Sequence, residues 1–532
     1  MTLFLCPVAK ALTKLSKHGF LLSPPGIDPF ICKAFLLCFT SDLPAKAAVL
    51  NCVQFNGYWG CSRCKQKGCR VRCSGSKGTV HVYPYCEANP SGPRRTHDET
   101  CKHAKSALTS TDSSVFGVKG PTWLATIPQY DIIRGTTIDY MHCILLGVCR
   151  QLLRLWLESK YHTELWYIGN QVHELDSCLC IIKPPSEVKR TPRSIQTRKY
   201  WKAHELRAWL LHYSPLVLLK ILQDDYYQHH LLLVEGVYLL LKDTVRQADV
   251  IQSSRLLNQY CFMFSPLYGE SQMSANVHGL LHLPEIVKDL GPLWAHSCFP
   301  YEAANGQILK FFHGSQGVEK QVVSRVSTLQ MISDIAKSTL EPESKEMNLY
   351  LKMHHKQKQM TNMKTILTDK RVLLGSAKYG MLEEHELDCI KSEGIVLPEH
   401  YYIYPKIYLA EKNRIVTTLS SSRAQKRVNS CVVYINADVN EHNYGLVQKL
   451  VMLDTHTFAI IICLKKAAQQ LYNNRIAKTN FDEHFIAFLP PRPNDLVLIP
   501  ACNIQDKCIY LDVHSIHGHV FASQFPNTME ME

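Results

Sequence analysis

The spacing of apolar residues divides the chain into a helical part and a strand-rich part. Residues 139–158 and 203–243 carry apolar side chains at positions i, i+3 and i+4, which predicts amphipathic helices. The same spacing returns over residues 272–335, and residues 336–372, rich in Lys, Met and Glu, predict an exposed helix or linker. After residue 400, β-branched and aromatic runs recur roughly every 10 to 15 residues, which predicts a separate small β-barrel or sandwich.

The amino-terminal segment has its own pattern. Apolar residues at helical spacing over residues 6–20 end at Gly19, which suits a helix C-cap. The run "PFICKAFLLCFTSD" then predicts a buried strand with a polar exit at Ser41 and Asp42. Residues 55–120, rich in Cys, Gly, Pro, Ser and basic residues, predict irregular structure held by ligands. We therefore expect an α/β fold followed by an all-β part.

Composition places the chain among globular proteins of a reducing compartment. A length of 532 residues predicts roughly two to four domains, and 46% hydrophobic with 20% charged residues argues against wholesale disorder. The 21 cysteines are an odd number without the spacing of a disulfide scaffold, so we expect a few thiols on metal and the rest buried. The start lacks the basic n-region of a signal peptide, and the longest apolar stretch, interrupted by Glu235, is too short to span a bilayer. These features predict a soluble, intracellular protein without a membrane partner.

The net charge of +13 favours a polyanionic partner, although a basic excess is also common in proteins that never touch nucleic acid. Seven basic residues against one acidic residue fall within residues 183–202, with Tyr200 and Trp201 interleaved. Phosphate contacts with base stacking explain such a segment, and so does an ordinary solvated surface. The candidate nucleic-acid contacts are Lys189, Arg190, Arg193, Arg198, Lys199 and Lys202.

A CxxC pair in "FNGYWGCSRCKQKG" is the first candidate for metal binding. Structural zinc takes four Cys or His ligands, commonly as two close pairs, and Cys61 and Cys64 form one pair. For the second pair, His278 and His282 in "NVHGLLHLPE" are four residues apart, which puts both imidazoles on one face of a helix. Unrelated helix histidines and core thiols are the plainer interpretation. The rival local ligands are Cys69, Cys73, Cys86, His81, His97, Cys101 and His103.

Acidic residues suggest a second kind of chemistry. An enzyme that splits phosphodiesters with two metal ions needs carboxylates that converge from distant parts of the chain. Asp42 ends the expected buried strand, and Glu302 starts an expected helix in "FPYEAANG". The plainer interpretation of Asp42 is a helix N-cap, and that of Glu302 is a first-turn acid favoured by the helix dipole. Asp139 and His142 in "DYMHCILLG" are a third polar pair, for which an N-cap Asp is again the plain interpretation.

Four long stretches carry a resemblance to a known family: "SDLPAKAAVLNCVQFNGYWGCSRCKQKG", "GVKGPTWLATIPQYDIIRGTTIDYMHCILLGV", "NVHGLLHLPEIVKDLGPLW" and "SCFPYEAANGQILKFFHGSQ". In this order they resemble the transposase domain of CACTA (En/Spm-type) DNA transposons, as found in transposase domain-containing proteins. The resemblance covers roughly residues 1 to 335 and, more loosely, the β-rich tail. It implies a ribonuclease H-like core with an Asp-Asp-Glu (DDE) metal-binding triad, interrupted by a large, mostly helical insertion.

The resemblance implies catalytic roles. Asp42 matches the second aspartate of the family, in a D-x-P-A motif, and Glu302 matches its final glutamate, in an F-P-[FY]-E-x-x-N-G motif. In the intact family, Mg²⁺ or Mn²⁺ held by the triad serves DNA cleavage and strand transfer between transposon ends and target DNA, in the nucleus. Asp139 and His142 match a D-x-M-H motif to which we assign no role.

The resemblance also implies a zinc site. Cys61 and Cys64 match the CxxC of the family. His278 and His282 match a later His pair, which completes a zinc site in related transposases and in the recombination-activating recombinase. The local cysteines remain the rival.

The sequence departs from the family at its start. In the family the first aspartate ends an earlier strand, whereas only 41 residues precede Asp42, and the one acid among them, Asp28, precedes a strand. We therefore expect an incomplete core with impaired two-metal binding, because the first carboxylate normally bridges the ions. The expected parts are a core remnant with the second Asp (1–60), a Cys-rich and helical insertion (61–271), returning core helices with the His pair and Glu (272–335), a helical linker (336–399) and a C-terminal β-rich module (400–532).

Three functions fit these observations. The first is a cut-and-paste transposase, with Asp42 and Glu302 as metal ligands. The second is a non-catalytic, zinc-stapled DNA-binding protein derived from one, which the absent first carboxylate favours. The third is an interaction protein whose C-terminal β-rich module binds a chromatin or other protein partner. A homodimer is a further expectation.

Overall fold

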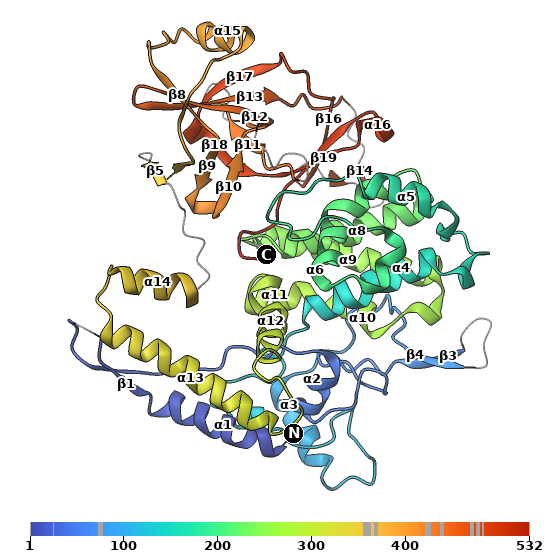
Figure 1. The fold of residues 1–532 in the computed structure, drawn as a ribbon. Coiled ribbons are helices and arrows are strands. Elements are labelled where there is room, and N and C mark those ends of the chain that lie inside the picture. The colour runs from blue at the N-terminus through green and yellow to red at the C-terminus, as the bar shows by residue number, and fades with distance from the viewer. Residues whose placement is uncertain are drawn as a thin grey trace.

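The computed structural model describes residues 2–24, 26–72, 78–354, 363–366, 371–420, 427–436, 441–468, 473–474, 479–480 and 484–530. Figure 1 shows an amino-terminal region in blue at the bottom of the view, a helical region in green, and a β-rich region in orange and red at the top. The carboxyl end lies between the β-rich region and the helices (Figure 1). Helices and open sheets are both present. In this part of the chain no helix has both the length and the apolar character that crossing a membrane requires.

The helical region is built around two long helices. α8 (Asp224–Leu240) packs against α9 (Gln247–Tyr268), and α8 is buried on nearly every face. Although it carries a few polar residues, α8 is mostly apolar and lies at the centre of the core. The helices predicted over residues 139–158 and 203–243 are confirmed. The other helical segments here are η2 (Met141–Cys149), α4 (Arg150–Leu157), η3 (Ser159–Tyr161), η4 (Gly169–Gln171), α5 (Val172–Leu179), η5 (Ile195–Tyr200), α6 (Ala203–Ala208), η6 (Trp209–Tyr213), α7 (Ser214–Val217), η7 (Glu270–Gln272), α10 (Ala275–Gly279), η8 (Leu280–His282), α11 (Leu283–Leu290) and η9 (Leu293–His296).

The amino-terminal region begins with α1 (Thr2–Lys17), which ends just before Gly19. Gly19 has a φ of 70°, so the predicted C-cap glycine has the left-handed backbone of such a cap. β1 (Phe20–Leu22) and β2 (Phe30–Cys32) then form an antiparallel pair with largely exposed side chains. After them α2 (Leu43–Leu50) lies against the core.

The prediction of one long buried strand before Asp42 is wrong. Only its start, in β2, is a strand, and the side chain of Leu37 is 80% exposed. Among the described residues, its one further pairing is a parallel bridge between Phe39 and Thr136. A continuous apolar run forms a buried strand only when neighbouring strands cover it, and most of this run has no such neighbours.

The Cys-rich segment is mostly irregular, as its composition predicts. It contains the hairpin of β3 (Cys69–Arg72) and β4 (Thr79–Val82), the helix α3 (His97–Ser106) and the turn η1 (Trp123–Thr126). Next to β4, the backbone N–H of Tyr83 donates to the carbonyl oxygen of Met273 at 2.9 Å. This contact joins the segment to the helical region just before the predicted His pair.

The chain then continues as α12 (Phe299–Ile308), α13 (Val318–Thr339) and α14 (Lys345–His354). The predicted helices are confirmed as far as His354, whereas residues 363–366 of the range 336–372 form a strand and the rest of that range up to residue 370 lies outside the described residues. α12 and α13 are not compactly packed. No residue of α12 is buried, and Tyr301 and Met331 are 61% and 60% exposed. α12 and α13 therefore form an exposed helical arm.

The β-rich region is made of open sheets. Its elements are β5 (Met363–Ile366), β6 (Val372–Leu374), β7 (Lys378–Tyr379), α15 (Glu384–Ser392), β8 (Tyr401–Tyr404), β9 (Lys406–Leu409), η10 (Ala410–Lys412), β10 (Arg414–Thr417), β11 (Cys431–Ile435), β12 (His442–Leu453), β13 (His456–Cys463), β14 (Asn473–Asn474), β15 (Thr479–Asn480), β16 (Phe485–Phe488), β17 (Leu496–Pro500), η11 (Ala501–Asn503), β18 (Ile504–Lys507), β19 (Ile509–Asp512), α16 (His514–His517) and β20 (Val520–Ser523). A seven-stranded sheet follows the order β17-β13-β12-β11-β18, with β8 on β12 and β7 on β8. Smaller sheets are β10-β9-β6-β5 and β16-β20-β19.

The seven-stranded and four-stranded sheets share one apolar cluster, which includes Ile407, Val416, Val447 and Ile461. Shared apolar contacts of this kind are the packing of two sheet faces. The strands that the structure describes close no barrel. β6 belongs to the four-stranded sheet although it precedes residue 400. The predicted β-rich character after residue 400 is confirmed.

Buried polar contacts dock the β-rich region on the helical region. Lys507 Nζ lies 2.7 Å from Glu187 Oε2, and both side chains are almost completely buried. Near the carboxyl end, the Asn527 side chain donates to the carbonyl oxygen of Leu241 at 2.9 Å. A buried ion pair is costly when one partner leaves, so these contacts hold the two regions together.

Candidate metal centre

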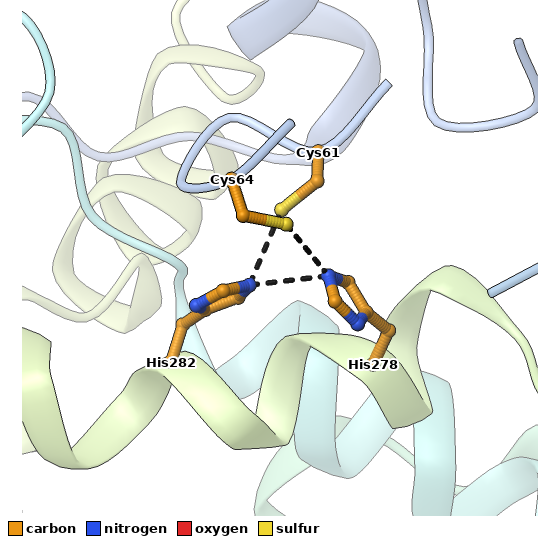
Figure 2. A group of neighbouring side chains, drawn as sticks. All are labelled: Cys61, Cys64, His278 and His282. Atoms are coloured by element: carbon orange, nitrogen blue, oxygen red, sulfur yellow. Dashed lines mark hydrogen bonds between the residues drawn. The ribbon is translucent and has the colours of Figure 1, made fainter. Parts of the chain in front are cut away.

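Four side chains converge from two segments that are far apart in the sequence. Figure 2 shows Cys61 and Cys64 on a loop, facing His278 and His282 on a helix. Cys61 Sγ lies 3.4 Å from His282 Nε2 and Cys64 Sγ 3.2 Å from His278 Nε2, across 221 and 214 residues of chain. The two Nε2 atoms are 3.1 Å apart, and all four ligand atoms lie within 4.8 Å of one another. The four ligand atoms are thus close enough together to hold one metal ion, and we call these four residues the metal centre.

Local structure on both sides places the ligands. His278 lies in α10 and His282 in η8, which continue one another, so residues four apart point to the same side. On the other side, Gly60 precedes Cys61 in a tight loop. A Cβ at position 60 would lie 2.3 Å from the carbonyl oxygen of Gln54, so a glycine is needed there.

The protonation states of the ligands follow from burial and from their contacts with one another. Burial lowers the pKa of His282, which keeps its imidazole neutral and able to offer a lone pair to a metal. The hydrogen bond with Cys64 holds the pKa of Cys61 well below its usual value, and the same contact raises the pKa of Cys64. Cys61 is thus the thiol of the pair that loses its proton more readily, and a metal ion bound by both sulfurs would release the protons that remain.

Arg95 organises the loop that carries the two cysteines. Its guanidinium is buried, and Nε donates to the carbonyl oxygens of Cys61 and Cys64 at 3.0 Å each. Its Nη2 donates to the carbonyl oxygens of Trp59 and Phe116 at 2.8 Å each. One rigid planar group therefore fixes four backbone carbonyls around the metal centre.

Arg63, between the two cysteines, makes a second link to the histidine helix. Its Nη2 lies 3.2 Å from Asp289 Oδ2 on α11, and its Nη1 donates to the carbonyl oxygen of Ile133 at 2.6 Å. The ring of Tyr83 stacks on His278, with ring centroids 5.0 Å apart. The loop is thus joined to α11 by an ion pair, and the segment after β4 is joined to His278 by a ring contact.

A second group of potential ligands consists of Asp139, His142 and Cys298, which we call the Asp139 clamp. Asp139 Oδ2 lies 2.6 Å from His142 Nδ1, and Asp139 Oδ1 accepts from the backbone N–H of Cys298 at 2.8 Å. The hydrogen bond with Asp139 raises the pKa of His142 to about 10. Burial disfavours the charged form of Asp139, but its hydrogen bonds with His142 and Cys298 still hold its pKa below the usual value. A protonated imidazole has no free lone pair, so the clamp joins two helix starts and is poorly suited to a metal.

The two predicted catalytic carboxylates occupy the positions of their plainer interpretations. Asp42 caps α2, and its Oδ1 accepts from the backbone N–H of Ala45 at 2.8 Å. Glu302 is an exposed acid in the first turn of α12. Neither belongs to a group of potential metal ligands among the described residues. Their catalytic role stays a prediction.

The local rivals of the His pair lie elsewhere. Cys69 is on β3 and Cys86 is exposed, and Cys73 lies outside the described residues. His97 and Cys101 face each other within α3, with Nε2 and Sγ 3.7 Å apart. In the part of the chain that the structure describes, none of the local candidates joins the CxxC pair.

Half of the predicted basic segment is engaged with other protein groups. Arg193 Nε lies 2.7 Å and Arg190 Nη1 3.6 Å from the carboxylate of Glu205. The carbonyl oxygen of Lys189 accepts from Arg427 Nη2 at 2.7 Å, which ties the segment to the β-rich region. The charges of Arg190 and Arg193 are therefore neutralised within the helical region, and only the backbone of Lys189 takes part in the contact with the β-rich region.

The other half of the basic segment faces a different neighbour. Lys202 is exposed at the start of α6, where its backbone N–H donates to Glu205. Arg198 and Lys199, on η5, line an open groove together with residues of α4. The six predicted contacts thus divide between at least two surfaces.

Three residues of these sites, Arg63, Arg95 and Cys298, were not predicted from the sequence. Arg63 could have been found from its place inside the CxxC pair, and Cys298 from its place directly before the "FPYE" motif. Nothing in "SGPRRTHDE" distinguishes Arg95 from the exposed Arg94 beside it. No protein-family model matches the chain, and no curated protein matches it. Function is therefore inferred from the residues and contacts of this chain.

Proposed function

We propose that the protein is a DNA-binding protein of the CACTA-transposase type, with a scaffold stapled by zinc and without strand cleavage by Asp42 and Glu302. The observation that supports this most is the metal centre. From the spacing of Cys and His residues alone, local cysteines were also possible partners of the CxxC pair. The resemblance instead implied a His pair more than 200 residues away, and in the structure this His pair lies against the CxxC pair. The net charge of +13 suits a polyanionic partner.

The donor set fits zinc. Bonds of about 2.3 Å to sulfur and about 2.05 Å to nitrogen put the ligand atoms of a tetrahedral site roughly 3.3 to 3.8 Å apart. The ring nitrogens and sulfurs of the metal centre lie 3.1 to 3.4 Å from their neighbours. Two thiols and two imidazoles favour zinc over Mg²⁺ or Ca²⁺, which prefer oxygen ligands. Cys61, Cys64, His278 and His282 would hold the ion, which would supply cross-linking of the chain.

The same residues give the zinc a structural role. Four protein ligands leave no position open for substrate, as in closed structural sites. The ion would join the loop before β3 to the helix that follows α9, and so close a segment of more than 200 residues. Such an ion contributes directly to folding stability.

The carboxylates favour the non-catalytic alternative over the transposase. A two-metal site needs acids that converge on ions roughly 3.5–4 Å apart. Asp42 is used as a helix cap, Glu302 points from an exposed helix, and Asp139 is held by His142 and Cys298. Supplying Mg²⁺ or Mn²⁺ to the full chain with terminal-repeat DNA is therefore expected to give no cleavage. Cleavage that Glu302→Ala abolishes would restore the transposase interpretation.

DNA binding and zinc are tested together on the purified full chain. Metal analysis should find one zinc per chain. Fluorescence anisotropy with labelled DNA should show binding that weakens steeply as salt rises, since phosphate contacts release counterions. No binding at low salt would contradict the proposed function and would favour the protein-interaction alternative.

A further inference from the structure

A groove of about 800 Å³ opens between α4, η5 and the start of α10. Its cationic lining comes from two separate parts of the chain, with Arg150 and Arg154 on α4, and Arg198 and Lys199 on η5. We call it the basic groove. Its other lining residues are Leu146, Gly147, Gln151, Leu153, Glu158, Gln196, Ser274 and Asn276.

The charges of the basic groove are incompletely neutralised within the protein. The Arg154 side chain is exposed, and its guanidinium makes no hydrogen bond or ion pair with the described residues. Arg150 donates to the carbonyl oxygen of Trp201 at 3.1 Å, a neutral partner that leaves its charge unbalanced. The single acid in the lining, Glu158, is already paired with Lys160 at 3.1 Å. Glu158 also interacts with Arg198, so the four cations of the groove share one acid that already has a lysine partner.

Close packing of these cations costs energy in the free protein. Arg150 and Arg154 are four residues apart on one helix, a spacing at which like charges destabilise the helix. The Arg198 guanidinium donates to two backbone carbonyl oxygens, and Lys199 Nζ lies 4.9 Å from the ring centroid of Tyr200. A bound polyanion would relieve this repulsion, and Tyr200, which follows the groove residue Lys199 in the chain, offers an exposed aromatic ring.

The metal centre fixes the floor of the basic groove. Ser274 caps α10, the helix that carries His278, and its Oγ donates to Gln151 Oε1 at 2.8 Å. On the same floor, Gly147 approaches Asn276 so closely that a Cβ would lie 2.5 Å from its amide nitrogen. The groove is therefore held in shape by the helix that carries His278, one of the four candidate metal ligands.

We propose that the basic groove binds single-stranded DNA, with phosphates on the four cations and a base stacked on Tyr200; this rests on the proposed DNA binding. A space of this size is that of a ligand pocket, which suits a few nucleotides of one strand. By contrast, two exposed arginines near the metal centre are paired with acids. Arg94 lies 3.2 Å from Glu285 and Arg134 2.7 Å from Asp289.

The test compares two double variants that each remove two exposed positive charges. The groove variant is Arg154→Ala with Lys199→Ala, and the control is Arg94→Ala with Arg134→Ala, whose side chains are 70% and 69% exposed but ion-paired. Binding of the zinc-loaded full chain to fluorescein-labelled (dT)20 and to a duplex of equal length is measured by anisotropy over a range of salt. Zinc content and Tm of every variant are measured alongside.

The groove variant should bind (dT)20 at least tenfold more weakly, with a salt dependence shallower by about 1.4 because each strand phosphate contact contributes about 0.7. The control should bind within about twofold of the wild type. Tyr200→Ala should weaken (dT)20 about tenfold and leave duplex binding unchanged.

Three results would overturn the inference. Equal losses of (dT)20 affinity in the groove variant and the control would show that binding depends on overall charge and not on the basic groove. Wild-type binding by the groove variant would put the DNA elsewhere and leave the proposed function standing. Equal affinity for duplex and (dT)20, lost in the same proportion, would refute the single-strand assignment. Absence of all DNA binding by the wild type would instead remove the proposed function itself.

Discussion

The metal centre and the Asp139 clamp are built from similar side chains but differ in what holds their protons. In the metal centre, two sulfurs and two ring nitrogens face one another, and burial keeps His282 neutral. In the clamp, Asp139 accepts from the N–H groups of two helix starts and from His142, which is held protonated. The ligand atoms of the metal centre therefore have lone pairs available for a metal ion, whereas the lone pairs of Asp139 and His142 in the clamp are occupied by protons and hydrogen bonds.

This difference shows that closeness of potential ligands does not define a metal site. The hydrogen bonds that each ligand atom already makes decide whether it can bind an ion. The metal centre should respond to loss of the metal and the clamp to loss of a charge. The comparison would fail if a mutation in the clamp removed the metal, or if a mutation of the metal ligands left the metal bound.

The largest effect should come from His278→Ala with His282→Ala. Zinc should co-purify with the wild type and be lost from this variant, and Tm should fall by about 10 °C or more, because metal binding energy is folding energy. Metal analysis and thermal unfolding measure both quantities. His142→Ala is the matched control, since it also removes an imidazole but should keep the zinc. Full zinc in the double variant would move the site to the local cysteines.

The sequence predicted the metal centre better than the strand before it. The four ligands were found because a CxxC pair and two His at helical spacing keep their local pattern wherever the chain goes, and the resemblance supplied the pairing between them. The strand over "PFICKAFLLCFTSD" failed because a strand needs neighbours, and an apolar run does not show whether they exist. The helices were predictable from local periodicity alone.

Other parts of the sites depend on tertiary contacts that leave no local mark. Arg94 and Arg95 are consecutive, yet one is 70% exposed and the other lies buried among four carbonyl oxygens. The basic segment likewise looked continuous, whereas Arg190 and Arg193 are paired with Glu205 and Arg198 turns to the basic groove. Which cation is neutralised is set by residues brought in from elsewhere in the chain.

The next effect tests the support of the metal centre. Arg95→Met leaves buried carbonyl oxygens of the CxxC loop without donors, so the free energy of unfolding should fall by about 2–4 kcal/mol and zinc should be removed more easily by a chelator. Arg94→Met, one position away, should change stability by about 0.5 kcal/mol or less because Arg94 is exposed. Urea unfolding and competition with a chelator measure the two effects. Similar losses in both variants would show that Arg95 does not organise the loop.

A smaller effect is expected for the clamp. Asp139→Asn keeps the shape of the side chain but removes the charge that holds the imidazolium of His142, so stability should fall by about 1.5–3 kcal/mol. Zinc content should stay at the wild-type value, which metal analysis checks on the same preparation. Loss of zinc from this variant would mean that the clamp and the metal centre act as one site.

The smallest effect is the pH dependence of the clamp. The folded-state pKa of His142, about 10, is above its unfolded value of about 6.5, so its contribution is complete below about pH 6.5 and is lost as pH rises towards 10. The stability difference between wild type and His142→Gln should therefore shrink over this range, by about 1–2 kcal/mol because the ring is partly exposed. In the Asp139→Asn background the same substitution should give a difference that varies much less with pH, because the charge that raises the pKa is gone. A difference that stays constant between pH 6.5 and 10 would show that His142 is already neutral in the folded protein, and would return the clamp to the groups able to bind a metal.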